Sequence, residues 1–203
     1  MKVFVLSNDD LTSNIIFSSL FDSKTIEVVG VAYTTTLAGK AGGIKGLLNL
    51  LKKTDFRYWL YLLFSNSAFK IFESLSGLLN YKSSRLWPRS VRQICKQEKV
   101  PIHKSSDFNS PTFLRVIKKA APDLIIIRAN QILKKDILGL AKFGTWCVHS
   151  SLLPSYKGIA GEFHAFNNGE EIIGSTIFSV DLELDKGPPL FQVFFPVKLN
   201  NSI

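Results

Sequence analysis

Hydrophobic positions along the chain fall into short apolar runs separated by longer stretches with helical spacing. The short runs, each typical of a buried strand, cover residues 2–6, 27–33, 100–103, 123–127 and 145–149. The stretches with helical spacing cover residues 12–20, 86–98, 111–120, 134–140 and 162–168. Strands that alternate with helices in this way predict βαβ units and a parallel sheet.

Two further apolar runs, at 172–180 and 190–197, follow each other without an intervening helix, so we predict an antiparallel pair at the edge of the sheet. The pattern as a whole predicts an α/β fold: a Rossmann-like, mostly parallel sheet with flanking helices, in one domain that covers residues 1–203. The glycine-rich segment Ala38–Gly43 follows the second strand rather than the first, so we interpret it as a connection and not as a phosphate loop.

The stretch between residues 44 and 79 is unusually rich in aromatic and aliphatic side chains. Polar residues at 65–67 and Lys70 interrupt it, so it lacks the run of about 20 apolar residues that a membrane span needs. We predict two helices, 44–64 and 67–79, within a helical insertion at residues 41–80. These helices either pack on the domain or present an amphipathic surface, through residues 56–79, to a membrane or to a second copy in a homodimer.

Charge and cysteine content add two expectations. The net charge of +9 favours anionic partners such as nucleotides, phosphates, nucleic acid or a membrane surface, although the lysines are scattered. The two cysteines, Cys95 and Cys147, form no CxxC pattern and have no metal-ligand spacing with histidine. The N-terminus is too short in apolar residues for a signal peptide. We therefore expect a cytoplasmic protein without a metal site.

His149 is the residue with the clearest chemical potential, because it ends a predicted strand that opens directly into a loop. Such positions carry reactive side chains in α/β folds, and histidine exchanges protons near neutral pH. Side chains alternate along a strand, so Thr145, Cys147 and His149 project to one side and Trp146 to the other. Taken alone, His149 favours a structural role, in which it bonds a backbone group at the strand end, and the residues that follow it change this interpretation.

The residues around His149 resemble those of the formyltransferase family that uses 10-formyltetrahydrofolate, which includes methionyl-tRNA formyltransferases and sugar N-formyltransferases. The matching positions are His149, Ser151, Leu152, Leu153, Pro154, Gly158, Asn168–Gly169, Gly174–Ile177 and Leu184–Pro188. Upstream, 122–127 and 130–133 resemble the strand and loop that line the folate site in that family. The resemblance covers residues 122–197 closely and 2–33 loosely.

The resemblance implies transfer of a formyl group from 10-formyltetrahydrofolate, as co-substrate, to an amine. It makes His149 the acid/base or oxyanion-stabilising group and Asp185 its carboxylate partner, with Asp181 less suited to that role. It implies a folate site formed by Asn130, Gln131, Ile132, Leu133, Asp181 and Leu182. It implies substrate contacts from Ser151, Leu152, Pro154, Tyr156, Lys157 and Gly158.

Cys147 departs from the family pattern, which has asparagine two residues before the histidine. An asparagine amide is a good hydrogen-bond donor for the formyl oxygen, whereas a thiol is a weak one. The resemblance therefore implies either a slow enzyme or a catalytically impaired folate-binding homologue. A nucleophilic role for Cys147 is the less favoured alternative, because direct attack by the amine needs no covalent carrier.

Three classes of amine acceptor occur in the family. The methionyl-tRNA enzymes carry a further C-terminal domain, which we expect to be absent here or lost by truncation. The glycinamide ribonucleotide enzymes have a glycine-rich loop after the first strand, where this chain has Ser7–Asp10. We therefore expect a small-molecule acceptor, a nucleotide-linked amino sugar, with tRNA as the second choice.

Overall fold

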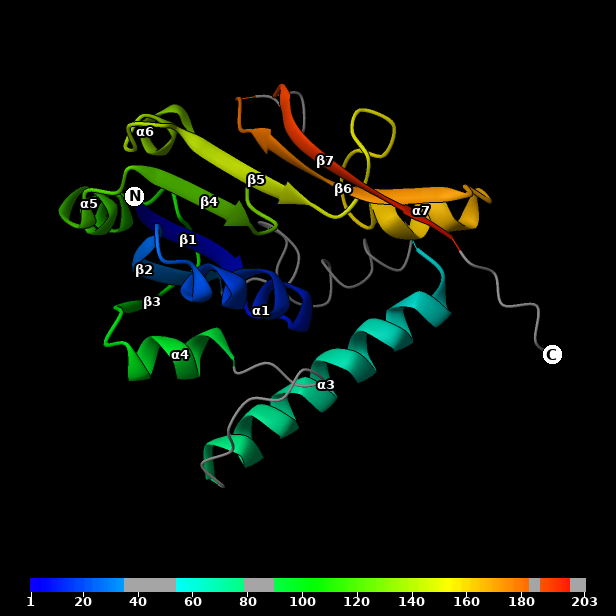
Figure 1. The fold of residues 1–203 in the computed structure, drawn as a ribbon, viewed down its shortest axis with the longest axis horizontal. Coiled ribbons are helices and arrows are strands. Elements are labelled where there is room, and N and C mark those ends of the chain that lie inside the picture. The colour runs from blue at the N-terminus through cyan, green and yellow to red at the C-terminus, as the bar shows by residue number, and fades with distance from the viewer. Residues whose placement is uncertain (35–53, 79–89, 183–186, 198–203) are drawn as a thin grey trace.

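The computed structural model describes residues 1–34, 54–78, 90–182 and 187–197. These residues form a seven-stranded sheet in the order β3-β2-β1-β4-β5-β6-β7 (Figure 1). The parallel strands are β1 (Lys2–Asn8), β2 (Glu27–Thr34), β3 (Ile102–Ser105), β4 (Leu124–Arg128) and β5 (Thr145–His149). Strands β6 (Ile172–Ser179) and β7 (Pro189–Pro196) run antiparallel at the edge. The predicted mostly parallel sheet and its antiparallel edge pair are thus both confirmed.

Helices cover both faces of the parallel part of the sheet. They are α1 (Leu11–Ser18), the short 3-10 helix η1 (Ser19–Asp22), α3 (Phe56–Leu78), α4 (Val91–Gln97), α5 (Pro111–Ala120), α6 (Lys135–Leu138) and α7 (Gly161–Asn167). Strand β1 shows how the faces divide: Phe4 and Leu6 join the core cluster under α5 and α6, whereas Val3 and Val5 join the cluster under α1 and α4. This alternation with period two buries the central strand on both sides.

The insertion differs from its prediction, because α3 is one helix where two were expected to meet near residue 66. The Ser65 hydroxyl and the Asn66 amide both donate to the Leu62 carbonyl oxygen, at 3.2 and 2.8 Å, so these polar side chains bond along the helix instead of ending it. Residues 44–53 and 79, also predicted to be helical, and Ala38–Gly43 lie outside the described residues. No helix in the described part of the chain is long and apolar enough to cross a membrane.

Other element boundaries moved by a few residues for local reasons. Helix α4 starts at Val91, because the Ser90 side chain caps it in a reciprocal capping box with Gln93; the predicted start at 86 lies outside the described residues. Strand β3 runs from Ile102 to Ser105, whereas the predicted strand covered residues 100–103. Lys99, directly before the predicted strand, has a left-handed backbone, which is not a strand conformation.

Strand order reverses between β1 and β4, and open α/β sheets bind ligands where the carboxyl ends of the strands meet such a reversal. The register pairs Ser7 with Arg128 and Ile127 with Cys147. Because these strands are parallel, Asn8 and His149, the last residues of β1 and β5, reach the same edge of the sheet. The fold therefore brings the end of the first strand and the predicted histidine to one crevice.

Candidate active site

His149 is held by the loop that follows it. Its Nε2 atom lies 2.8 Å from the backbone carbonyl oxygen of Tyr156. A carbonyl oxygen only accepts hydrogen bonds, so Nε2 must carry the proton that it donates. In the neutral imidazole this leaves Nδ1 without a proton and able to accept one. The structural role considered for His149 is therefore present, and it occupies only one of the two ring nitrogens.

The loop from Ser151 to Gly158 is built around two buried hydroxyl groups. The Ser151 hydroxyl donates to the Tyr156 carbonyl oxygen at 2.6 Å, beside the bond from His149. The Thr176 hydroxyl of β6 donates to the Ser151 carbonyl oxygen at 2.8 Å and accepts from the Leu153 amide at 3.1 Å. Gln192 of β7 donates to the Leu153 carbonyl oxygen at 2.9 Å. The antiparallel edge pair thus fixes the loop that orients His149.

The predicted substrate-binding residues divide into buried supports and exposed groups. Ser151 is buried with its hydroxyl occupied, and Leu152 packs against Gly174, where a Cβ would collide with it. The Tyr156 hydroxyl donates to Glu170 at 2.6 Å. Pro154 and Lys157 are exposed, and Gly158 has a left-handed backbone. A hollow of about 80 Å³ lies between this loop, α7 and β6, well below the several hundred Å³ of a typical ligand pocket.

Cys147 lies on the same face of β5 as His149, as the alternation predicts. It packs against the core cluster under α5 and α6, whereas Trp146 packs against the opposite cluster. In register it faces Ile127 on one side and Phe178 on the other, and the thiol is partly buried and not in a disulfide. The described residues include no group of three histidine, cysteine or acidic side chains that could hold a metal ion.

The acidic loop is described only in part. Asp185, the predicted carboxylate partner of His149, lies outside the described residues, as does Glu183. Asp181 is exposed, and its carboxylate accepts the backbone amide of Leu182 at 2.6 Å. Leu182 is also exposed. The pairing of His149 with Asp185 therefore stays a prediction.

The predicted folate loop is anchored by its own side chains. The Gln131 amide donates to the Thr34 hydroxyl at 2.7 Å, and its oxygen accepts from the Phe108 amide at 2.9 Å. Leu133 is buried in the core, so only its backbone can face a ligand. Ile132 is the large apolar side chain of the loop that remains exposed.

The carboxyl end of β1 meets this loop through Asn130. The Asn130 backbone amide donates to the side-chain oxygen of Asn8 at 3.4 Å. Asn8 is thus a partly buried amide at the same sheet edge as His149, and it was not singled out from the sequence. Its place follows from the strand register, which the sequence alone does not give.

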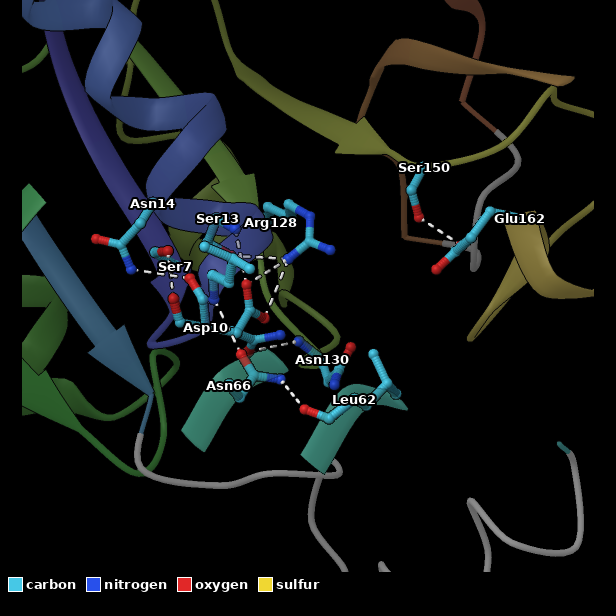
Figure 2. A network of polar contacts seen from close by, with 12 residues as sticks. Ser7, Asp10, Ser13, Asn14, Leu62, Asn66, Arg128, Asn130, Ser150 and Glu162 are labelled. Carbon is cyan, nitrogen blue, oxygen red and sulfur yellow. Dashed lines mark hydrogen bonds and ion pairs between the residues drawn. The ribbon is translucent and has the colours of Figure 1, made fainter. Parts of the chain in front are cut away.

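Glu162, in the first turn of α7, is a second residue that sequence reasoning missed. Its carboxylate accepts from the Ser150 hydroxyl at 2.7 Å and from the Tyr58 hydroxyl of α3 at 2.6 Å. Figure 2 shows Ser150 and Glu162 facing each other across the end of β5. Burial, and then the Glu162 charge, raise the pKa of Tyr58 well above its usual range. An acidic residue opening the helix after the histidine loop was the available signal.

The N-terminus of α1 is already occupied by side chains of this chain. The Asp10 carboxylate accepts the Ser13 amide at 2.7 Å, and Arg128 of β4 donates to Asp10 at 3.0 and 3.1 Å. The Asn66 side-chain oxygen of α3 accepts the Leu11 amide at 2.9 Å. Figure 2 shows these groups converging at the end of β4. Helix N-termini bind phosphate through free backbone amides. Here the Asp10 carboxylate and the Asn66 side-chain oxygen accept two of these amides in place of a phosphate.

Asp9, the neighbour of Asp10, forms ion pairs with two basic side chains. Arg92 of α4 donates to it at 2.6 Å, and Lys70 of α3 forms a second ion pair with it. Partial burial by itself raises the pKa of Asp9, but the hydrogen bonds and charges of Arg92 and Lys70 outweigh burial and hold that pKa below its ordinary value. The Arg92 guanidinium also lies 4.5 Å above the ring centre of Tyr33. These contacts join α3 and α4 to the loop after β1.

Comparison with known proteins agrees with this architecture. The family model described as formyl transferase matches residues 82–203. The methionyl-tRNA formyltransferase of Kosmotoga olearia is 34% identical over 112 residues, which are 55% of this chain and 36% of that protein. That of Thermotoga maritima is 31% identical over 112 residues, again 55% of this chain and 36% of that protein. The chain thus spans little more than a third of these curated relatives.

Solved structures share the fold at low sequence identity. The glycinamide ribonucleotide transformylase 1 of Symbiobacterium toebii aligns with a TM-score of 0.62 and 13% identity, covering 100% of this chain and 76% of that one. A formyltetrahydrofolate deformylase from Pseudomonas syringae aligns with a TM-score of 0.57 and 14% identity, covering 99% and 53%. The family model matches more than half of the chain and includes His149 and the loop that holds it. This chain therefore belongs to the formyl transferase family.

Proposed function

We propose that this chain is the catalytic domain of an enzyme that transfers a formyl group from 10-formyltetrahydrofolate to a primary amine, and that the amine belongs to a nucleotide-linked amino sugar. The observation that carries the proposal is the position of His149 at the carboxyl end of β5, held by a loop that matches the family model. The two free cysteines fit our further expectation of a reducing, cytoplasmic location.

His149 would act through Nδ1. The folate would supply the formyl group, whose oxygen gains negative charge as the amine attacks. With Nε2 bonded to the Tyr156 carbonyl, the neutral imidazole offers Nδ1 as the base that takes the proton released by the amine. The protonated ring then has an Nδ1–H that can donate toward developing negative charge and would return its proton to the folate N10 as the bond between N10 and the formyl carbon breaks. Asp185 would orient the ring or relay the proton through water, as the family resemblance implies.

The residues proposed for the folate site have the chemistry that a pterin requires. Such a ring needs apolar walls with a few polar groups at its edge. Ile132 and Leu182 offer exposed apolar side chains, and the backbones of Asn130 and Gln131 offer polar groups beside them. The loop at residues 130–133 and the loop that begins at Val180 contact the same part of the core, because Leu133 and Val180 both pack in the cluster under α5 and α6.

Cys147 would set the rate. It occupies the position where an asparagine amide would donate to the formyl oxygen, and a thiol donates weakly. Loss of one such donor lowers turnover by roughly 10²–10³ in a protease. We therefore expect slow transfer by the natural chain, and a folate-binding homologue with impaired chemistry is the corresponding alternative.

The contacts at the α1 N-terminus favour an amine acceptor whose phosphate groups bind elsewhere. Asp10 and Asn66 accept the Ser13 and Leu11 amides, so these two amides are not available to hold a phosphate. This disfavours glycinamide ribonucleotide and leaves the amino-sugar nucleotide and methionyl-tRNA. The second candidate, transfer to initiator methionyl-tRNA, is favoured by the names of the curated relatives that are 31–34% identical.

The proposal is tested by incubating the purified chain with 10-formyltetrahydrofolate and a panel of amines while release of tetrahydrofolate is followed. The panel contains amino-sugar nucleotides, initiator methionyl-tRNA and glycinamide ribonucleotide, and Cys147→Asn is assayed in parallel. Turnover on an amino-sugar nucleotide supports the proposal, and turnover on methionyl-tRNA selects the second candidate. Transfer by Cys147→Asn alone means a preserved site with impaired chemistry. No transfer by either protein, without folate binding, contradicts the transferase assignment.

A further inference from the structure

Helix α3 uses one face to bind the rest of the molecule. On that face Phe69 is 1% exposed, Tyr58 bonds Glu162, and Asn66 bonds the Leu11 amide. The Tyr58 ring also packs against that of Phe163 of α7 in a tilted arrangement, with 4.7 Å between the ring centres. These contacts fix the orientation of the helix about its axis, and so they determine which other side chains it directs away from the domain.

A second face of α3 is apolar and exposed. It consists of Tyr61, Phe64, Ala68, Ile71 and Leu75, which we call the α3 seam. Tyr61 is 64% exposed, Phe64 71%, Ile71 62% and Leu75 52%. Ala68 is exposed as well. At 100° per residue these five positions lie within one quadrant of the helix surface, and none of them is charged.

The spacing of the seam is that of a helix-pairing surface. Successive members are three, four, three and four residues apart, which is the spacing that lines up apolar side chains along one side of a helix for packing against another helix. The contacts of α3 with the domain include those of Tyr58, Asn66 and Phe69, none of which belongs to the seam. A seam of this kind is matched by another helix of similar length with an apolar stripe.

We propose that α3 pairs antiparallel with α3 of a second copy of this chain, about a twofold axis that passes beside Ala68. In that arrangement Ala68 faces Ala68 and Tyr61 faces Leu75, while Phe64 lies one residue out of level with Ile71 and packs beside it. The smallest side chain thus lies where the helices approach most closely, and each aromatic ring packs against an aliphatic side chain. The seam is its own complement, as a twofold interface requires.

The area of the seam is sufficient for a modest dimer. An aromatic side chain buries roughly 150–250 Å² when it is enclosed, and the exposed fractions of the seam then give on the order of 500 Å² per copy. Two copies would bury about 1,000 Å², the lower bound for a specific interface. We therefore expect a weak dimer.

A lipid surface fits the seam less well than a second copy. Helices that lie in a membrane interface carry several lysine or arginine side chains along the polar face. The basic residues of α3 are Arg57 and Lys70, and Lys70 is paired with Asp9. Within the described helix the seam therefore lacks the row of cations that would hold it on anionic lipid.

Sedimentation velocity of the full chain at micromolar concentrations tests the proposal. We expect a species of twice 22.7 kDa, a loss of affinity of at least about tenfold in Phe64→Glu, and no change in Ser67→Glu, an exposed residue outside the seam. Phe194→Glu on β7, which also exposes apolar side chains, should leave the dimer intact. A monomeric natural chain, a dimer that survives Phe64→Glu, or one that only Phe194→Glu abolishes would overturn the proposal.

Disulfide trapping tests the geometry independently of stability. Ala68→Cys should cross-link two copies under mild oxidation, because it faces itself across the axis. Tyr61→Cys should not, since its two copies would be about 21 Å apart along the helices, too far for a disulfide. Efficient trapping of Tyr61→Cys would contradict the antiparallel register. Co-sedimentation of a monomeric chain with phosphatidylserine vesicles, lost in Phe64→Glu, would assign the seam to lipid instead.

Discussion

The Nε2 atom of His149 lies 2.8 Å from the carbonyl oxygen of Tyr156, seven residues further along the chain. The same oxygen accepts the Ser151 hydroxyl at 2.6 Å, so both of its lone pairs have donors. The imidazole is therefore part of the folding of its own loop. Its structural and its chemical roles are compatible because they use different ring nitrogens.

Replacing His149 with glutamine should separate these two roles. A glutamine amide can still donate to the Tyr156 carbonyl, but it cannot take up a proton. We expect His149→Gln to unfold at nearly the same temperature as the natural chain and to lose about 10²–10⁴-fold in formyl transfer, the usual contribution of a positioned acid or base. Single-turnover assays beside thermal melts measure both effects. Activity within about tenfold of the natural chain would exclude Nδ1 as the base.

Thr176 should be a stability determinant of the histidine loop. Its buried hydroxyl bonds the Ser151 carbonyl and the Leu153 amide, and it accepts the Gln192 amide at 3.0 Å. Thr176→Val keeps the shape of the side chain and removes this hydrogen-bond partner from the Ser151 carbonyl and the Leu153 amide, so we expect a loss of about 1–3 kcal/mol in the free energy of unfolding.

Urea denaturation of Thr176→Val checks this value. Thr176→Ser keeps the hydroxyl and serves as the control, with a smaller loss. Equal losses in the two variants would mean that the methyl group, rather than the hydrogen bonds, stabilises this position.

Features encoded by neighbouring residues could be predicted from the sequence. The apolar runs at residues 2–6 and 145–149 predicted strands, and the order of strands and helices predicted the parallel sheet. The motif from His149 to Gly158 led to the family because its residues match the family pattern, and two of its hydrogen bonds, from His149 and Ser151 to the Tyr156 carbonyl, lie within the motif itself.

Features that depend on distant partners could not be predicted. The polar residues near Asn66 indicated a helix break, but the partner of its side-chain oxygen is the Leu11 amide, 55 positions away in the chain. The Glu162 carboxylate likewise meets a hydroxyl of Tyr58, 104 positions away. Local patterning carries no information about such pairs, so the link between α3 and the histidine loop emerged only from the structure.

Tyr58 and Glu162 should therefore be energetically coupled. We expect Tyr58→Phe to reduce the free energy of unfolding by about 1 kcal/mol and Glu162→Gln by about 1–3 kcal/mol, since hydrogen bonds to a charged group are the stronger ones. In a double-mutant cycle the two losses should add to more than the loss in the double variant, because both changes remove one shared bond. Strictly additive losses would contradict the coupling. Tyr61→Phe, on the exposed seam, is the matched control.

Asp9 should make stability depend on acidity. Its pKa in the folded chain lies below the ordinary value, so its contribution is complete above the ordinary aspartate pKa of about 3.9 and is lost as pH falls through the lowered value. At pH 7 the carboxylate binds Arg92 and Lys70, and we expect Asp9→Asn to cost about 1–2 kcal/mol.

The two proteins should converge in acid, because protonated aspartic acid and asparagine are both neutral. Urea midpoints of the natural chain and of Asp9→Asn, measured between pH 7 and about pH 2, test this sign. The difference between the two urea midpoints should become smaller as pH falls. High salt should also reduce this difference at pH 7, because ions screen the partly exposed Lys70 and Arg92. A difference that stays constant with pH would show that Asp9 contributes by its shape rather than by its charge.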